Sequence, residues 1–215
     1  MSLLKRSEFL FKAGYSVMMI DFQGHGKSQG QMITAGYLEK HDVTSAVAKA
    51  KSLEPGQPIA IIGISLGGAA ALLASPLGVD ALVLEGVYST IRRAIQNRIS
   101  KYLPFVYPIP TELLLLQFYL RFGIRASHLR PIDFVAKTKC PLFFISGTHD
   151  NKTTADEVKA MHQRAKSPRQ LWLVKGARHV DLHRFTPKLY ESKMVSFLAK
   201  YMNKSLKQDT THPKK

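Results

Sequence analysis

Short runs of apolar and β-branched residues alternate along this chain with longer segments in which apolar residues recur at helical spacing. The alternation is typical of βαβ units built around a parallel sheet. The expected strands are Tyr15–Phe22, Ile59–Ile64, Ala81–Val87, Pro141–Ser146 and Gln170–Val174. The expected helices are Leu3–Ala13, Thr34–Leu53, Gly67–Ala74, Thr154–Ala165 and Thr186–Met202. The pattern predicts an α/β fold with a mostly parallel sheet and helices on both faces.

Residues 88–139 interrupt the alternation. A proline-rich connector, YLPFVYPIP, is followed there by the apolar segment TELLLLQFYLRFGI, which is too short to cross a bilayer. Such an insertion usually lies over the carboxyl edge of an α/β sheet as a lid, although an ordinary packing helix or a dimer contact would fit the same pattern. We expect one domain over residues 1–215, with a short lid insertion at about 88–139 and a flexible tail at about 204–215.

The strongest chemical signal is the G-x-S-x-G motif GISLG at 63–67, directly after an expected strand and before a helix of small residues. A serine on a sharp strand-to-helix turn has a strained backbone that projects its hydroxyl away from neighbouring groups. Glycines two residues to either side allow the adjacent elements to approach closely. Because a helix N-terminus favours developing negative charge, Ser65 is the candidate nucleophile and the Leu66 N–H a candidate oxyanion donor.

A nucleophilic serine needs a general base and a carboxylate that orients the base. Asp150 follows the expected strand 141–146 in the sequence GTHD, and His179 follows the strand 170–174 in GARH. Both residues lie at carboxyl ends of strands, where α/β sheets place their sites. Their order along the chain, Ser65, Asp150, His179, is the order expected for this type of hydrolase. We therefore predict that these three side chains form a catalytic triad.

Other residues could take these roles. His183 is an alternative base and Glu85 an alternative acid, whereas His149 shares the loop of Asp150 and has poor geometry for a base. A metal site at His179, Asp181 and His183 is a further alternative. Acyl transfer without a metal already accounts for His179, so we expect neither a metal nor a cofactor.

The composition describes an ordinary globular chain with a strongly basic balance. Hydrophobic residues make up 45% of the 215 residues, and the formal net charge is +16. The basic residues are spread along the whole chain without a nucleic-acid-binding motif, so nucleic acid is an improbable partner. An anionic substrate, peripheral contact with an anionic membrane, or a merely solvated basic surface remain as explanations. Cys140 is the only cysteine, which excludes an intramolecular disulfide and makes a reducing cytoplasm the expected location.

The chain resembles the α/β-hydrolases of the lysophospholipase and serine-aminopeptidase-like branch, known as abhydrolase-domain proteins. The resemblance extends from about residue 3 to 202 and depends on four sequences: DFQGHGKSQG, GISLGG, GTHD and GARHVDLHRF. It implies a serine hydrolase that cleaves carboxylic esters through an acyl-enzyme without a cofactor. Lysophospholipid and monoacylglycerol are the substrates that the resemblance suggests. Amide or peptide cleavage by the same triad is the enzymatic alternative, and a non-catalytic or weakly active hydrolase-fold remnant is the other.

The resemblance also exposes a departure from the family pattern. Family members begin with two or three strands and carry an oxyanion loop between the third strand and the first helix, whereas this chain starts about where that helix should start. The missing third strand would lie between Tyr15–Phe22 and Ile59–Ile64, so these segments are expected either to stay unpaired along facing edges or to pair directly. We therefore expect an N-terminally truncated hydrolase with weak activity, because loss of one oxyanion donor costs about 10²–10³ in kcat.

Overall fold

The computed structural model describes residues 3–166 and 168–202, so the tail expected at about 204–215 lies outside the described residues. Within them, four strands form one parallel sheet whose spatial order follows the chain. Glu85 is in register with Ile64 on one side and with Ile145 on the other, which places the carboxyl ends of neighbouring strands along one edge. The strands are β1 (Ala60–Ile64), β2 (Ala81–Glu85), β3 (Leu142–Gly147) and β4 (Arg169–Val174).

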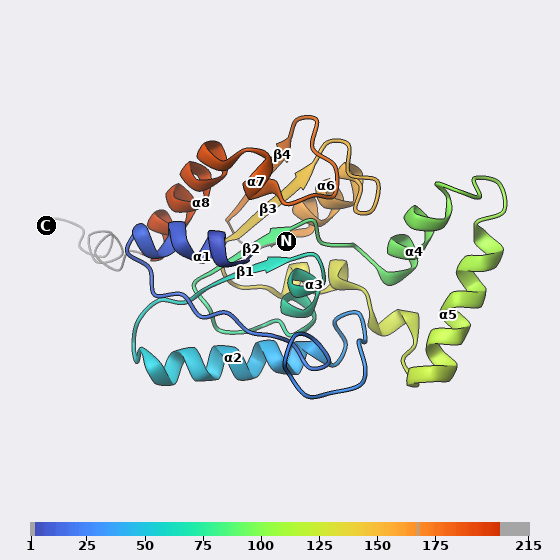
Figure 1. Cartoon of the computed structure of the whole chain (residues 1–215), viewed down its shortest axis with the longest axis horizontal. Helices are drawn as coiled ribbons and strands as arrows, with labels where there is room; N and C mark the ends of the chain where they lie inside the picture. The colour runs from blue at the N-terminus through green and yellow to red at the C-terminus, as the bar shows by residue number, and fades with distance from the viewer. Residues whose placement is uncertain (1–2, 167, 203–215) are drawn as a thin grey trace, which may run out of the picture.

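Helices pack on both faces of this sheet, as the sequence predicts (Figure 1). Every residue of β2 and β3 is buried, because alternate side chains enter two different cores. Leu82 and Leu84 pack into the core beneath α2 (Glu39–Leu53), α3 (Leu66–Leu73) and α6 (Ala155–Arg164). Ala81 and Val83 pack into the opposite core, beneath α1 (Leu3–Lys12) and α8 (Pro187–Met202).

The prediction of a strand at Tyr15–Phe22 is wrong. The segment has no strand conformation, and Val17, Met18 and Met19 are each 38–47% exposed. An isolated extended segment gains no ladder hydrogen bonds, and β1 pairs only with β2 among the described residues. Of the two outcomes expected for this edge, the structure shows the unpaired one.

The expected helix Thr34–Leu53 begins five residues late, at Glu39. The Glu39 side chain is fully buried and accepts hydrogen bonds from Thr34 N, Thr34 Oγ1 and Gly36 N at 2.7–2.8 Å. These bonds fold the preceding residues into a loop over the carboxylate. Residues 34–36 therefore donate hydrogen bonds to the Glu39 side chain in a loop instead of forming the first turn of the helix, and the helix starts later.

Residues 88–139, which we call the cap, form α4 (Ile91–Ile99), α5 (Pro108–Phe122) and three short 3-10 turns, η1 (Ala126–His128), η2 (Pro131–Asp133) and η3 (Val135–Lys137). Figure 1 shows α4 and α5 beyond the edge of the sheet toward which the strand arrows point. The cap is anchored by Leu129 and Ile124, which pack with Leu73 of α3. The same edge of the sheet carries the short helix α7 (Leu182–Phe185).

Candidate active site

Ser65 lies at the turn between β1 and α3. Its backbone has φ 50° and ψ −113°, a positive-φ conformation that is strained for any residue other than glycine. The Ser65 N–H donates to the carbonyl of Glu85 at 2.7 Å, which ties the turn to the end of β2. The local geometry is the sharp strand-to-helix turn that the motif predicts.

Two glycines allow α3 to begin directly against β1. A Cβ added to Gly63 would lie 2.5 Å from Gly68 Cα, and one added to Gly68 would lie 2.2 Å from Val87 Cγ2. Gly67, by contrast, would place its Cβ at an ordinary 3.7 Å from Phe22 Cε2. The close approach that the sequence assigns to the glycines flanking Ser65 therefore holds for Gly63 and depends on Gly68 rather than on Gly67.

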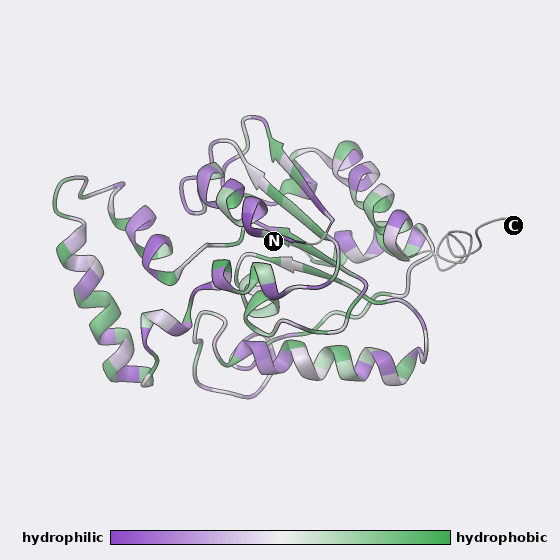
Figure 2. Cartoon of the chain, turned by 180° about the vertical axis from the view of Figure 1, so that it is seen from behind, coloured by the Kyte–Doolittle hydropathy of each residue, from purple (hydrophilic) through white to green (hydrophobic). Residues whose placement is uncertain are grey.

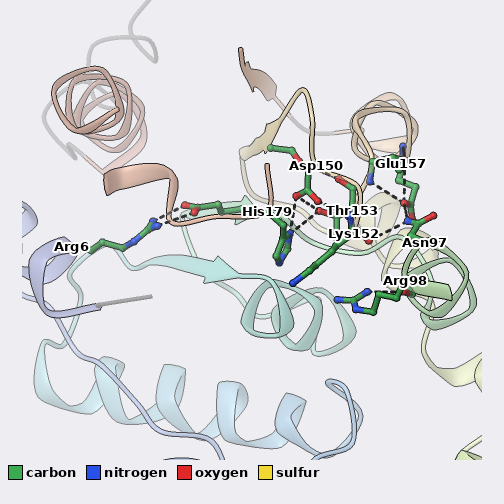
Figure 3. Close-up of polar contacts among 12 residues, drawn as sticks. Arg6, Asn97, Arg98, Asp150, Lys152, Thr153, Glu157 and His179 are labelled. Atoms are coloured by element: carbon green, nitrogen blue, oxygen red, sulfur yellow. Dashed lines mark hydrogen bonds and ion pairs between the residues drawn. The ribbon is translucent and has the colours of Figure 1, made fainter. Parts of the chain in front are cut away.

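Asp150 and His179 form a hydrogen-bonded pair. The imidazole Nδ1 donates to Asp150 Oδ2 at 2.8 Å, and the carboxylate is almost completely buried (Figure 3). Asp150 Oδ1 accepts from the backbone of Lys152 and Thr153 at 2.8 and 2.9 Å, and Oδ2 accepts from Thr153 Oγ1 at 2.8 Å. Burial alone would raise the pKa of Asp150, but the hydrogen bonds from His179 and Thr153 outweigh it and lower that pKa.

The His179 imidazole lies over Gly86, at the end of β2. A Cβ added to Gly86, the residue after β2, would lie 3.3 Å from His179 Cε1, so the ring covers the end of β2. Because β2 is the neighbour of β1, this position is one strand away from Ser65. Among the described residues no hydrogen bond joins the Ser65 hydroxyl to the ring; in unliganded enzymes such bonds are often long. Because Gly86 has no side chain, the imidazole has room to lie over it.

The alternative acid and base have other partners. Glu85 lies in a buried cluster, where its carboxylate accepts from Arg6 at 2.6 and 2.9 Å and from Tyr190 Oη at 2.8 Å. His183 Nε2 bonds Glu191 on α8 at 2.7 Å. Asp181 is paired with Arg6 at 2.7 Å. Within residues 3–166 and 168–202, no group of three His, Cys, Asp or Glu side chains could hold a metal ion.

A protein-family model described as "Serine aminopeptidase, S33" matches residues 5–113, slightly more than half of the chain. The chain belongs to this family. Ser65 lies inside the matched residues, whereas Asp150 and His179 lie beyond them.

Curated relatives of this S33-family chain are similar over most of its length. The YqkD protein of Bacillus subtilis (strain 168) is 24% identical over 205 residues, 91% of this chain and 66% of its own. The alpha/beta hydrolase domain-containing protein WAV2 of Arabidopsis thaliana is 25% identical over 201 residues, 91% of this chain and 64% of its own. The chain thus spans about two thirds of the length of these relatives.

Solved structures of α/β-hydrolases share the fold. The Pyrococcus furiosus esterase Pf2001 superposes with a TM-score of 0.74 at 25% identity, covering 94% of this chain and 77% of the esterase. A monoacylglycerol lipase from Paleococcus ferrophilus gives a TM-score of 0.65 at 18% identity, covering 93% of this chain and 89% of the lipase. The S33-family chain is therefore an α/β-hydrolase.

The remaining predicted site residue, Leu66, is the first residue of α3. The N–H groups of the first helical turn have no partner within their own helix, so the Leu66 N–H is free of intrahelical bonding. It also adjoins the positive end of the helix dipole. This position is suitable for an oxyanion donor, and the assignment stays a prediction.

Sequence reasoning missed Thr153 and Gly86. Thr153 supplies two of the bonds that hold Asp150, and its position three residues after an aspartate in the sequence DNKT is a turn-forming pattern that could have indicated it. Gly86 has φ 58°, but nothing in the local sequence shows that a residue 93 positions later would lie over it.

An open apolar groove of about 500 Å³ lies between α4 and α5. Apart from the Arg98 side chain, its lining residues are apolar or aromatic: Ile99, Tyr102, Leu103, Pro110, Leu113 and Leu114. Figure 2 shows hydrophobic segments along α5, where Leu113 and Leu120 are 61% and 74% exposed. None of the helices in the described residues is both long and apolar enough to span a membrane. The cap therefore offers a surface for an apolar chain.

Proposed function

We propose that this chain is a serine hydrolase that cleaves carboxylic esters through an acyl-Ser65 intermediate. The observation that carries the proposal is the Asp150–His179 hydrogen bond of 2.8 Å, with the ring over the end of β2. A serine held at φ 50° ends the neighbouring strand β1. Membership of a family of serine hydrolases and the likeness to an esterase support it. We assign Ser65, Asp150 and His179 as the triad and Leu66 N–H as an oxyanion donor.

In the proposed reaction His179 Nε2 takes the proton from Ser65 Oγ as the oxygen attacks the ester carbonyl. Asp150 holds the imidazole through Nδ1 and stabilises the imidazolium that forms. The Leu66 N–H and the start of α3 stabilise the oxyanion. The imidazolium then protonates the leaving alcohol, and a water molecule activated by His179 hydrolyses the acyl-Ser65 ester.

The cap groove supports an ester with an apolar chain as the substrate, with monoacylglycerol and lysophospholipid as the leading candidates. A relative named "Monoglyceride lipase homolog" from monkeypox virus is 24% identical over 220 residues, which supports the first of these. The description of the family as a serine aminopeptidase favours amide cleavage as a second candidate function. A matched ester and anilide with one acyl chain would separate the two activities.

Besides the ester substrate, we propose an anionic membrane as a peripheral partner. The exposed apolar residues of α5 lie next to α4, which carries Arg92, Arg93 and Arg98. Apolar and basic side chains together favour peripheral contact with an anionic bilayer. Vesicles containing phosphatidylserine should therefore retain the protein at low salt better than phosphatidylcholine vesicles; equal retention would contradict the proposal.

Covalent labelling by a fluorophosphonate probe tests the proposed nucleophile. We expect the probe to modify Ser65, identified by peptide mass spectrometry, and the label to be lost in Ser65→Ala. Replacing His179 by Ala should lower the labelling rate by at least 10²-fold, because the base is lost. As a matched control, Ser52→Ala, on the exposed end of α2, should label like the wild type. Labelling at another serine, or labelling that persists in Ser65→Ala, would overturn the proposal.

A further inference from the structure

Two cationic side chains point toward the region of His179 (Figure 3). Lys152 belongs to the loop between β3 and α6, and Arg98 belongs to the last turn of α4 in the cap. In the view of Figure 3, the Lys152 side chain runs past the imidazole, and the Arg98 side chain extends from α4 toward the end of Lys152. A loop of the hydrolase sheet and a helix of the cap thus contribute one positive charge each to the same region.

Hydrogen bonds of the neighbouring residues fix this arrangement. Asn97 Nδ2 donates to the carbonyl of Lys152 at 3.1 Å and to Glu157 Oε2 at 2.5 Å. Ser89 Oγ donates to the other oxygen of Glu157 at 2.6 Å. The backbone of Lys152 is also held from the other side, because its N–H donates to Asp150. The spacing between α4 and the Lys152 loop is therefore built into the fold.

Neither cation is paired with a carboxylate among the described residues. Arg98 Nη1 donates to the carbonyl of Ala94 at 2.6 Å, and no ion pair within residues 3–166 and 168–202 includes Arg98 or Lys152. Glu157, which shares the Asn97 amide with the Lys152 carbonyl, is already bonded by Asn97, Ser89 and Thr154. Two like charges held close together repel, and an anion between them would remove that repulsion.

We propose that Arg98 and Lys152 form a subsite for a phosphate group on the ester substrate, next to the scissile bond. The inference depends on the proposed hydrolase function, since it assigns the substrate class of that site. A phosphate monoester carries close to two negative charges at neutral pH and accepts charge-assisted hydrogen bonds from both a guanidinium and an ammonium group. The preferred substrate is then an acylglycerol phosphate rather than a neutral acylglycerol.

Two matched esters test the subsite, 1-lauroylglycerol and 1-lauroylglycerol 3-phosphate, each used below its aggregation concentration. The readout is the ratio of their kcat/KM values, phosphorylated over neutral. We expect this ratio to exceed one for the full chain and to fall at least tenfold in Arg98→Gln and in Lys152→Gln. Lys49→Gln, an exposed lysine of α2, is the charge-matched control and should leave the ratio unchanged. A ratio unaffected by Arg98→Gln and Lys152→Gln, or lowered equally by Lys49→Gln, would overturn the subsite.

Binding without turnover separates this inference from the function on which it depends. In the Ser65→Ala protein, calorimetry should show tighter binding of dodecyl phosphate than of dodecyl maltoside. In the double variant Ser65→Ala/Arg98→Gln, the two affinities should be equal. If neither ester is hydrolysed and Ser65 is not labelled, the proposed function fails while this binding result still decides the subsite. If the neutral ester is hydrolysed but dodecyl phosphate shows no preference, the subsite fails and the hydrolase proposal stands.

Discussion

At the scale of single residues, the Asp150 carboxylate is fixed in the candidate site by several hydrogen bonds. Besides the bond from His179, it accepts three hydrogen bonds from residues of its own loop. A group whose pKa is lowered by folding stabilises the folded state above its ordinary pKa, and this contribution is lost as pH falls through the lowered value. Asp150 therefore contributes stability at neutral pH that disappears in acid.

Replacement of Thr153 by Val tests this account, because it removes the hydroxyl that donates to Asp150 and keeps the branched shape. The native pKa of Asp150 should rise toward its ordinary value, so stability at neutral pH should fall by about 1.5–3 kcal/mol. The acid-unfolding midpoint should move to higher pH. Urea melts across the acid range measure both quantities, with Thr44→Val on the exposed face of α2 as control. Unchanged acid unfolding would show that the hydroxyl does not stabilise the carboxylate.

At the scale of elements, one buried ion cluster joins α1, α7 and α8 to the end of β2. The Arg6 side chain comes from α1, is 4% exposed, and bonds Glu85, Asp181 and Tyr190. Its Nε atom is buried and has no hydrogen-bond partner within the described part of the chain, so the cluster is incompletely satisfied there. Asp181 caps α7 and lies two residues after His179, which links this cluster to the loop that carries the proposed base.

Substitutions in this cluster should show strong coupling. Arg6→Met leaves the buried Glu85 carboxylate without its counterion and should destabilise the protein by about 3–5 kcal/mol. In the double variant Arg6→Met/Glu85→Leu, both charges are gone, so most of that loss should be recovered. Denaturant unfolding of the wild type, both single variants and the double variant gives the coupling energy. Additive losses would contradict the picture of a buried pair.

At the scale of the whole molecule, the open side of β1 is the most unusual feature. The described sheet ends at β1, and the apolar segment Tyr15–Phe22 does not pair with it. Amide protons in the hydrogen bonds of a buried sheet exchange with solvent only when the protein unfolds extensively, whereas the protons of unpaired amides exchange freely. We expect residues 16–21 to exchange at least 10²-fold faster than residues of β2 and β3. Hydrogen exchange followed by mass spectrometry measures this, and equally slow exchange in both regions would mean that a ladder forms in solution.

The sequence by itself determined the elements whose signal is local. The runs that form β2 and β3 are recognisable because strands buried on both faces are continuously apolar. The half-buried β1 and β4 are recognisable as short apolar runs, and the turn at Ser65 is recognisable because its motif specifies the backbone. The order of Ser65, Asp150 and His179 after three of these strands suggested a common site, because carboxyl ends of parallel strands share an edge.

Only the tertiary structure decided what depends on partners distant in the chain. The segment 15–22 has the local pattern of a strand, but it remains unpaired since pairing needs a neighbour that no local pattern supplies. Glu85 and His183 bond Arg6 and Glu191, which they meet only in the folded chain. The space for the imidazole above Gly86, and the approach of Arg98 to Lys152, likewise arise where separate elements pack together. Local conformation is encoded in neighbouring residues, whereas side-chain chemistry depends on which groups folding brings into contact.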